Sequence, residues 1–146
     1  MSEYTLYKNA RILDPKSALD IKGALLTKDD KITDFGENVT APDNAKIVDL
    51  NGLCLCPGLI DMRVFVGIPG ADYKDTIVNT GEAAAAGGVT TVCVQPNTDP
   101  IIDSIAHIEH LALRAKNALI NFVAMPAATK QMEGKEMTEI GLMSKA

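Results

Sequence analysis

The residues with the clearest chemical meaning lie in one apolar segment, CPGLIDMRVFVGIPG, from Cys56 to Gly70. Pro57-Gly58 leads into a predicted strand, and Ile68-Pro69-Gly70 predicts a turn after it. Side chains two positions apart on a strand point to the same face, so we expect Arg63 and Phe65 to share one. Arginine stays protonated and has no lone pair to donate, and phenylalanine has no donor atom. This pair of residues therefore cannot bind zinc.

His107 and His110 are three residues apart on a predicted helix, a spacing that could also hold a metal. We favour a different interpretation, in which they belong to a polar stripe that an outer helix shows to water. The stripe comprises Asp103, His107, His110, Arg114 and Asn117, and the opposite apolar stripe comprises Ile101, Ile105, Ile108, Ala112 and Ala115.

Three smaller candidates have structural interpretations beside their functional ones. Asp99 and Asp103 could act as paired carboxylates, but we favour a role in capping the helix near Ser104. Asn97 is either a ligand-binding residue or only a turn residue, because Pro-Asn-Thr favours a turn whatever its function. Cys54-x-Cys56 could be half of a metal site, and we favour two small buried side chains on a strand.

The 146 residues carry a net charge of −5, with 47% hydrophobic and 4% aromatic residues. This composition is typical of a globular protein that binds neither nucleic acid nor an anionic membrane. No apolar run reaches the roughly 18 residues of a membrane span. Three cysteines and the absence of a secretory signal pattern in MSEYTLYKNA predict a cytoplasmic protein without disulfides.

Residues 1–57 predict a small β-sandwich or β-roll, because short strands alternate with turn residues. The expected strands are Tyr4–Leu13, Asp20–Thr27, Lys31–Phe35 and Lys46–Leu55. Lys28-Asp29-Asp30 predicts a hairpin connection between the second and third of these strands.

Residues 58–146 predict alternating strands and helices, the pattern of parallel βαβ units. The expected strands are Leu59–Val66, Val89–Val94 and Ile120–Met125; the expected helices are Tyr73–Ala86, Ser104–Asn117 and Lys135 to the end. Asp72, with Asp75, is the expected cap of the first helix, and Ala83–Ala86 would let that helix lie close to the sheet. A (β/α)₈ barrel needs eight such units, so we expect a truncated or split part of a longer chain.

The Cys56–Gly70 segment resembles the first barrel strand of the amidohydrolase superfamily, P-G-x-[IV]-D-x-H-x-H, with Asp61 in the place of its aspartate. The segment Gly81–Asp103, GEAAAAGGVTTVCVQPNTDPIID, is similar to the A-x-x-G-G-[FV]-T-T-V and P-N-T-x-P motifs of dihydroorotases. The resemblance implies a β-sandwich over residues 1–57 and the first three βα units of an amidohydrolase TIM barrel over residues 58–146.

The same resemblance assigns roles to single positions. Arg63 and Phe65 replace the two histidines that hold catalytic zinc in active dihydroorotases, so no metal or other cofactor is expected here. Gly67 replaces the arginine that binds the substrate carboxylate, whereas Asn97 matches a substrate-contacting asparagine. The remaining family ligands would lie beyond residue 146.

Three hypotheses follow. The first is a catalytically inactive dihydroorotase-like protein, a structural or regulatory subunit in pyrimidine biosynthesis; inactive forms in this family associate with aspartate transcarbamoylase. The second is an active cyclic amide hydrolase with an altered site. The third is a truncated product without activity of its own. We favour the first, because metal-dependent amide hydrolysis is hard to replace once its ligands are gone.

Overall fold

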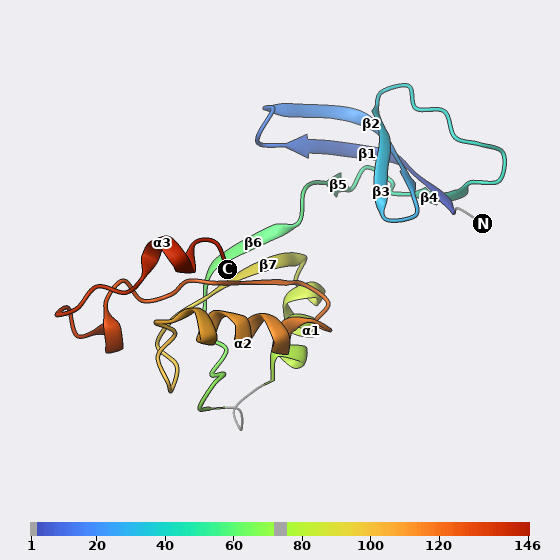
Figure 1. The fold of residues 1–146 in the computed structure, drawn as a ribbon. Helices are drawn as coiled ribbons and strands as arrows, with labels where there is room; N and C mark the ends of the chain where they lie inside the picture. Colours follow the sequence, from blue (N-terminus) through green and yellow to red (C-terminus); the bar gives the residue numbers. More distant parts are fainter. Residues whose placement is uncertain (1–2, 72–75) are drawn as a thin grey trace. The chain divides into compact units, whose positions relative to one another are not determined.

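The computed structural model describes residues 3–71 and 76–146 and divides the chain into two compact units, Met1–Pro57 and Gly58–Ala146 (Figure 1). The first unit is one five-stranded sheet in the order β3-β2-β1-β4, with β5 also paired to β1. Its strands are β1 (Tyr4–Asp14), β2 (Leu19–Lys28), β3 (Lys31–Gly36), β4 (Lys46–Asp49) and β5 (Cys54–Leu55). A sandwich has two sheets, and residues 3–57 form one, so the second layer stays a prediction.

The expected hairpin is present: β2 and β3 pair antiparallel, with Lys28 opposite Lys31. Asp29 at its tip has a φ of 53°, the left-handed backbone that such tight turns require. The expected strand Lys46–Leu55 is instead two strands, β4 and β5, both parallel to β1. The prediction failed here because β1 has a bulge between Tyr7 and Ala10, where the Gly52 N–H donates to the Asn9 carbonyl across the break.

The second unit has a three-stranded parallel sheet in the order β6-β7-β8. Its strands are β6 (Leu59–Val64), β7 (Val89–Val94) and β8 (Asn121–Ala124), and its helices are α1 (Ile77–Ala86), α2 (Ile105–Ala115), the 3₁₀ turn η1 (Lys130–Met132) and α3 (Ile140–Met143). The alternation of strands and helices that the sequence predicts is therefore observed through α2 and β8.

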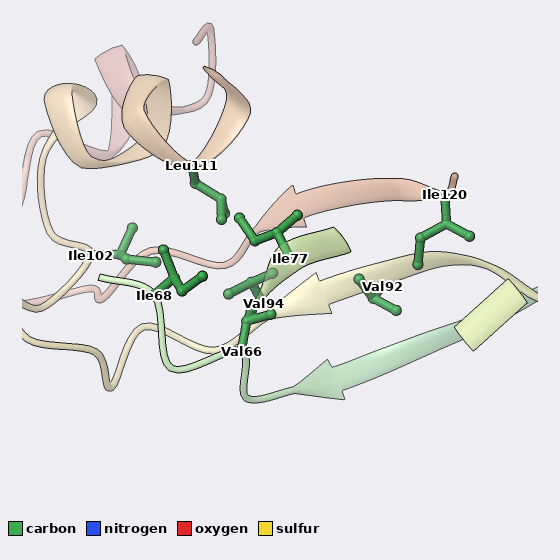
Figure 2. Packing of buried hydrophobic residues seen from close by; sticks show 8 residues of the cluster. All are labelled: Val66, Ile68, Ile77, Val92, Val94, Ile102, Leu111 and Ile120. Atoms are coloured by element: carbon green, nitrogen blue, oxygen red, sulfur yellow. The ribbon is translucent and has the colours of Figure 1, made fainter. Parts of the chain in front are cut away.

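The core of the second unit lies between one face of this sheet and the helices α1 and α2. Figure 2 shows Val92 and Val94 of β7 facing Ile77 of α1 and Leu111 of α2. The other buried members of the cluster are Val66, Ile68, Ile102 and Ile120. Gly81 of α1 is buried, whereas three residues of the alanine run, Ala83, Ala85 and Ala86, are exposed.

Three predictions about the helices need correction or qualification. Thr76 caps α1 by accepting a hydrogen bond from the Asn79 N–H at 3.1 Å; the expected start at Tyr73 and the cap at Asp72 with Asp75 lie outside the described residues. On α2, Leu111 is buried, whereas Ala112 is exposed.

The expected third helix from Lys135 is wrong, because only one helical turn, α3, forms in this region. Gly134 has a φ of 72°, and the buried Thr138 hydroxyl donates to the Ala127 carbonyl at 2.8 Å. A threonine hydroxyl that bonds to distant backbone competes with helix formation, which explains the loop.

Candidate functional site

The positions singled out from the sequence lie at the carboxyl ends of β6 and β7. Arg63 is the fifth residue of β6, and Phe65 and Gly67 follow along the same segment. The Gln95 N–H, just after β7, donates to the Val64 carbonyl at 2.9 Å, so the two strands end side by side. Asn97 lies two residues further on. Sites of parallel α/β folds form at this edge, where the loops after the strands meet.

Arg63 and Phe65 lie on the sheet face that the helices do not cover. Val64 packs against the core and Val66 is buried in it, while Arg63 is exposed and Phe65 keeps 48% of its surface exposed. A register shift occurs between Asp61 and Val64, and the Asp61 carboxylate accepts a hydrogen bond from the Arg63 backbone N–H at 2.9 Å. Asp61 therefore shapes the bulge that presents Arg63 at the open face.

The neighbours on this face supply few hard metal ligands. The Cys93 thiol of β7 lies 3.8 Å from the Met62 sulfur, and the Gln95 side-chain amide donates to the Met125 sulfur at 3.5 Å. Within residues 3–71 and 76–146, no group of three or more His, Cys, Asp or Glu side chains is placed to hold a metal ion. Beside the single Cys93 thiol and the single Asp61 carboxylate, this face offers a guanidinium, a phenyl ring, an amide and thioethers, which do not complete the ligand set of a catalytic zinc.

Gly67 occupies a backbone position that disfavours any larger residue. Its φ is 68°, and a Cβ added there would lie 3.2 Å from both the Cβ and the carbonyl oxygen of Ala71. Left-handed backbone costs an L-residue about 1–2 kcal/mol, so an arginine at this position would be strained. The backbone at this position therefore favours glycine over arginine.

The loop that contains Asn97 is held by its neighbours and not by Asn97 itself. The Thr98 hydroxyl is buried and donates to the Pro100 carbonyl at 2.8 Å, and the Ile102 N–H donates to the Pro96 carbonyl at 3.0 Å. The Asn97 side chain is exposed, with no hydrogen bond to another described residue. The geometry leaves the Asn97 amide available to a ligand.

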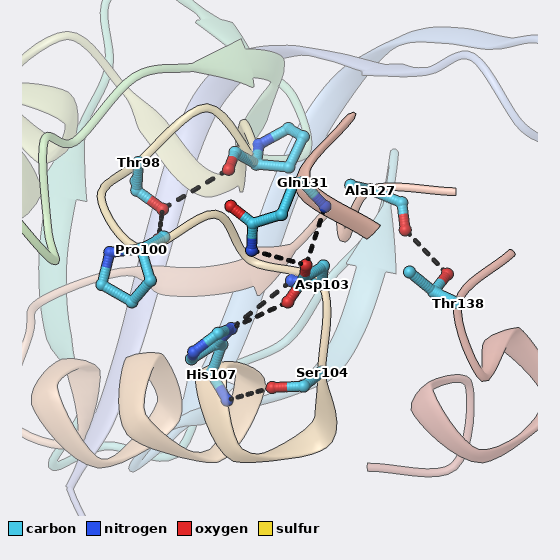
Figure 3. Close-up of polar contacts among 9 residues, drawn as sticks. Thr98, Pro100, Asp103, Ser104, His107, Ala127, Gln131 and Thr138 are labelled. Atoms are coloured by element: carbon cyan, nitrogen blue, oxygen red, sulfur yellow. Dashed lines mark hydrogen bonds and ion pairs between the residues drawn. The ribbon is translucent and has the colours of Figure 1, made fainter. Parts of the chain in front are cut away.

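The other candidates lie elsewhere and have structural contacts. His107 lies 3.3 Å from Asp103, whose carboxylate is only 9% exposed, so these two residues do not belong to a solvated stripe (Figure 3). Ser104 caps α2 by accepting from the His107 N–H, in place of the expected Asp99 or Asp103. Cys54 and Cys56 are exposed free thiols, which contradicts the expectation that they are buried.

Sequence reasoning missed the role of Asp103. Its spacing of four residues from His107 is the signal that could have indicated an ion pair at the start of the helix.

The four positions Arg63, Phe65, Gly67 and Asn97 do not line the apolar hollow of about 670 Å³ between α2, β8 and α3, where Leu111, Phe122 and Met143 are among the lining residues. None of the described helices is long and apolar enough to cross a membrane.

Fold and site together define an α/β chain whose candidate residues lie where two parallel strands end. Residues 52–146 match the Dihydro-orotase-like family, and the chain belongs to that family. The dihydroorotase of Wolbachia sp. subsp. Drosophila simulans (strain wRi) is 46% identical over 141 residues, covering 96% of this chain and 32% of that protein. The dihydroorotase of Ehrlichia chaffeensis is 46% identical over 129 residues, covering 85% and 29%.

The fold of this chain is also similar to that of a solved structure. The D-hydantoinase (dihydropyrimidinase) from Thermus sp. matches with a TM-score of 0.71 at 25% identity, over 97% of this chain and 30% of that chain. The chain therefore spans about a third of the length of the curated relatives named above.

Proposed function

We propose that this chain is part of a dihydroorotase-like protein that does not hydrolyse cyclic amides and acts as a structural or regulatory subunit of pyrimidine biosynthesis in the cytoplasm. The observation that supports this proposal is the pair Arg63 and Phe65 on the open face, at the carboxyl end of β6. A catalytic metal would meet a fixed positive charge at one position and a hydrocarbon ring at the other.

The proposal includes the architecture of the whole protein. Three parallel strands with two covering helices are consistent with the first three βα units of an incomplete TIM barrel, and the sheet of residues 3–57 with one layer of a β-sandwich. Arg63 would then lie where the barrel mouth forms and pair with a carboxylate from a later unit. Phe65 would fill space that a metal and its water occupy in active members.

A second candidate is a working cyclic amide hydrolase with an altered site. Two observations favour it: the relatives that are 46% identical carry the name dihydroorotase, and the Asn97 amide is exposed beside β7. A third reading, that the 146 residues alone are an inactive fragment, agrees with the partial coverage of those relatives.

Metal content and turnover separate the first two candidates. We expect the purified protein, after growth and purification in excess zinc, to hold substoichiometric zinc and to hydrolyse dihydroorotate no faster than buffer. The double variant Arg63→His/Phe65→His is the matched control, because it returns two nitrogen ligands to the same strand positions. Near-stoichiometric zinc in the unmodified protein, with turnover above buffer, would refute the non-catalytic function.

The partner that fits a non-catalytic dihydroorotase-like protein is aspartate transcarbamoylase, since inactive members of the family associate with it. Co-purification followed by gel filtration with the transcarbamoylase of the same cell tests this association. Separate elution, together with a transcarbamoylase that is assembled and fully active without this protein, would exclude the partner.

A further inference from the structure

The segment after β8 is a closed loop, and we name residues 127–138 the strap. Its two ends are joined where the Thr138 hydroxyl donates to the Ala127 carbonyl at 2.8 Å and the Ala128 carbonyl at 3.1 Å. Further along, Thr129 and Met137 form an antiparallel bridge. The strap therefore has a neck that is closed by hydrogen bonds at its two ends.

Asp103 lies outside the strap and binds Gln131 at its tip. One oxygen of its carboxylate, Oδ2, accepts from the Gln131 backbone N–H at 3.0 Å and from the Gln131 side-chain amide at 3.2 Å (Figure 3). The other oxygen, Oδ1, lies 3.3 Å from Nδ1 of His107. Hydrogen bonds to an ionised acceptor are about twice as strong as neutral ones, so the tip is held mainly by this one side chain.

Gln131, which Asp103 binds, and the residue after it have strained backbones. Gln131 and its neighbour Met132 have φ values of 52° and 58°, although neither is glycine. Non-glycine residues keep such conformations only where the surrounding contacts enforce them. Asp103 therefore accepts a hydrogen bond from the backbone N–H of Gln131, one of the two residues with left-handed backbone.

We propose that the strap is a two-position element whose closed position is held by the Asp103 carboxylate against the backbone strain of Gln131 and Met132. In the released position both residues return to right-handed or extended backbone, and the tip leaves the start of α2. The Ala127 N–H donates to the Ile102 carbonyl at 2.8 Å, which ties the neck to the residue before Asp103.

Amide hydrogen exchange in the protein as the cell makes it tests the strap. In Asp103→Asn, which keeps the side-chain size and removes the charge, we expect exchange of the Gln131 amide to accelerate about tenfold or more, with little change at Val92 and Val94. Asp99→Asn is the matched control, because Asp99 is an exposed acid on the same loop whose side chain has no hydrogen bond or ion pair with the described residues of the strap. It should leave the Gln131 amide unchanged.

Met132→Gly provides an independent test if Asp103→Asn does not fold. Glycine removes the left-handed strain while the Gln131 N–H keeps its acceptor, so exchange of the Gln131 amide should slow. An equal acceleration at Gln131 and at the core amides in Asp103→Asn, or no acceleration at all, overturns the proposal. Faster exchange at Gln131 in Met132→Gly also overturns it, because an unstrained loop would only gain freedom from glycine.

Discussion

Replacing Gly81 by alanine should stabilise the second unit, although Gly81 is buried at the centre of α1. A Cβ added there would lie 3.6 Å from the Ala118 Cβ and 3.7 Å from the Leu119 N and the Phe122 ring, which is ordinary van der Waals contact. Glycine inside a helix is about 1 kcal/mol less favourable than alanine, and a buried methyl group adds about 0.8 kcal/mol. We therefore expect the free energy of unfolding to rise by about 1–2 kcal/mol.

Thermal melting of the folded protein, followed by circular dichroism, measures this change. For a unit of this size about 1 kcal/mol raises the melting temperature by roughly 4–8 °C. The control is Gly88→Ala, the same chemical change at a φ of 79° with open space around the Cβ, which should lower stability by about 1 kcal/mol. A lower melting temperature for Gly81→Ala would show that α1 lies closer to the loop before β8 than the structure has it.

Three further predictions concern the cap of α1, an ion pair and assembly. Thr76→Ala should cost about 1 kcal/mol of stability in the same melting assay and Thr76→Ser much less, because serine keeps the acceptor for the Asn79 N–H. Hydrogen bonds from Arg11 lower the pKa of Asp20. The pair therefore stabilises the protein at pH values above the ordinary aspartate pKa, and this contribution is lost as the pH falls through the lowered pKa of Asp20. Arg11→Ala should raise the pKa of Asp20, which an NMR titration measures. Residues 1–146 expressed alone should self-associate in sedimentation, because β6 and β8 each have one edge without a strand partner in the described sheet; a monodisperse monomer with a sharp melt would contradict this.

Strand and helix positions followed from the sequence wherever local pattern and tertiary packing agree. The β-branched run Val89–Val94 is β7 at the predicted bounds, and α2 (Ile105–Ala115) lies within the predicted range Ser104–Asn117. The strand predicted over Lys46–Leu55 broke because its partner β1 has a bulge at Asn9, a long-range cause that no local pattern contains. The helix predicted from Lys135 failed for a similar reason, since the Thr138 hydroxyl bonds to carbonyls ten and eleven residues away.

Some residues of the candidate site were also predicted correctly from local pattern, and others were not. Alternation along a strand was enough to predict that Arg63 and Phe65 would share a face, and these residues lie on the side opposite the buried Val66. The helical stripe was a weaker guide, because the polar residues Asp103 and His107 satisfy each other and are partly buried. A polar residue at helical spacing indicates a solvated face only when nothing else along the chain approaches it, and here the strap does.

Positions 63, 65 and 67, at and just after the end of β6, belong to one continuous backbone segment. Gly67 allows the left-handed turn after the strand, in which the Ala71 N–H donates to the Gly67 carbonyl at 2.6 Å. Returning histidines to positions 63 and 65 would restore nitrogen ligands, yet an arginine at position 67 would meet both the φ of 68° and the Ala71 contacts at 3.2 Å. Metal binding and recognition of a substrate carboxylate would therefore not return together. Under the proposed function, this segment serves as part of a stable framework, because its turn requires glycine at position 67.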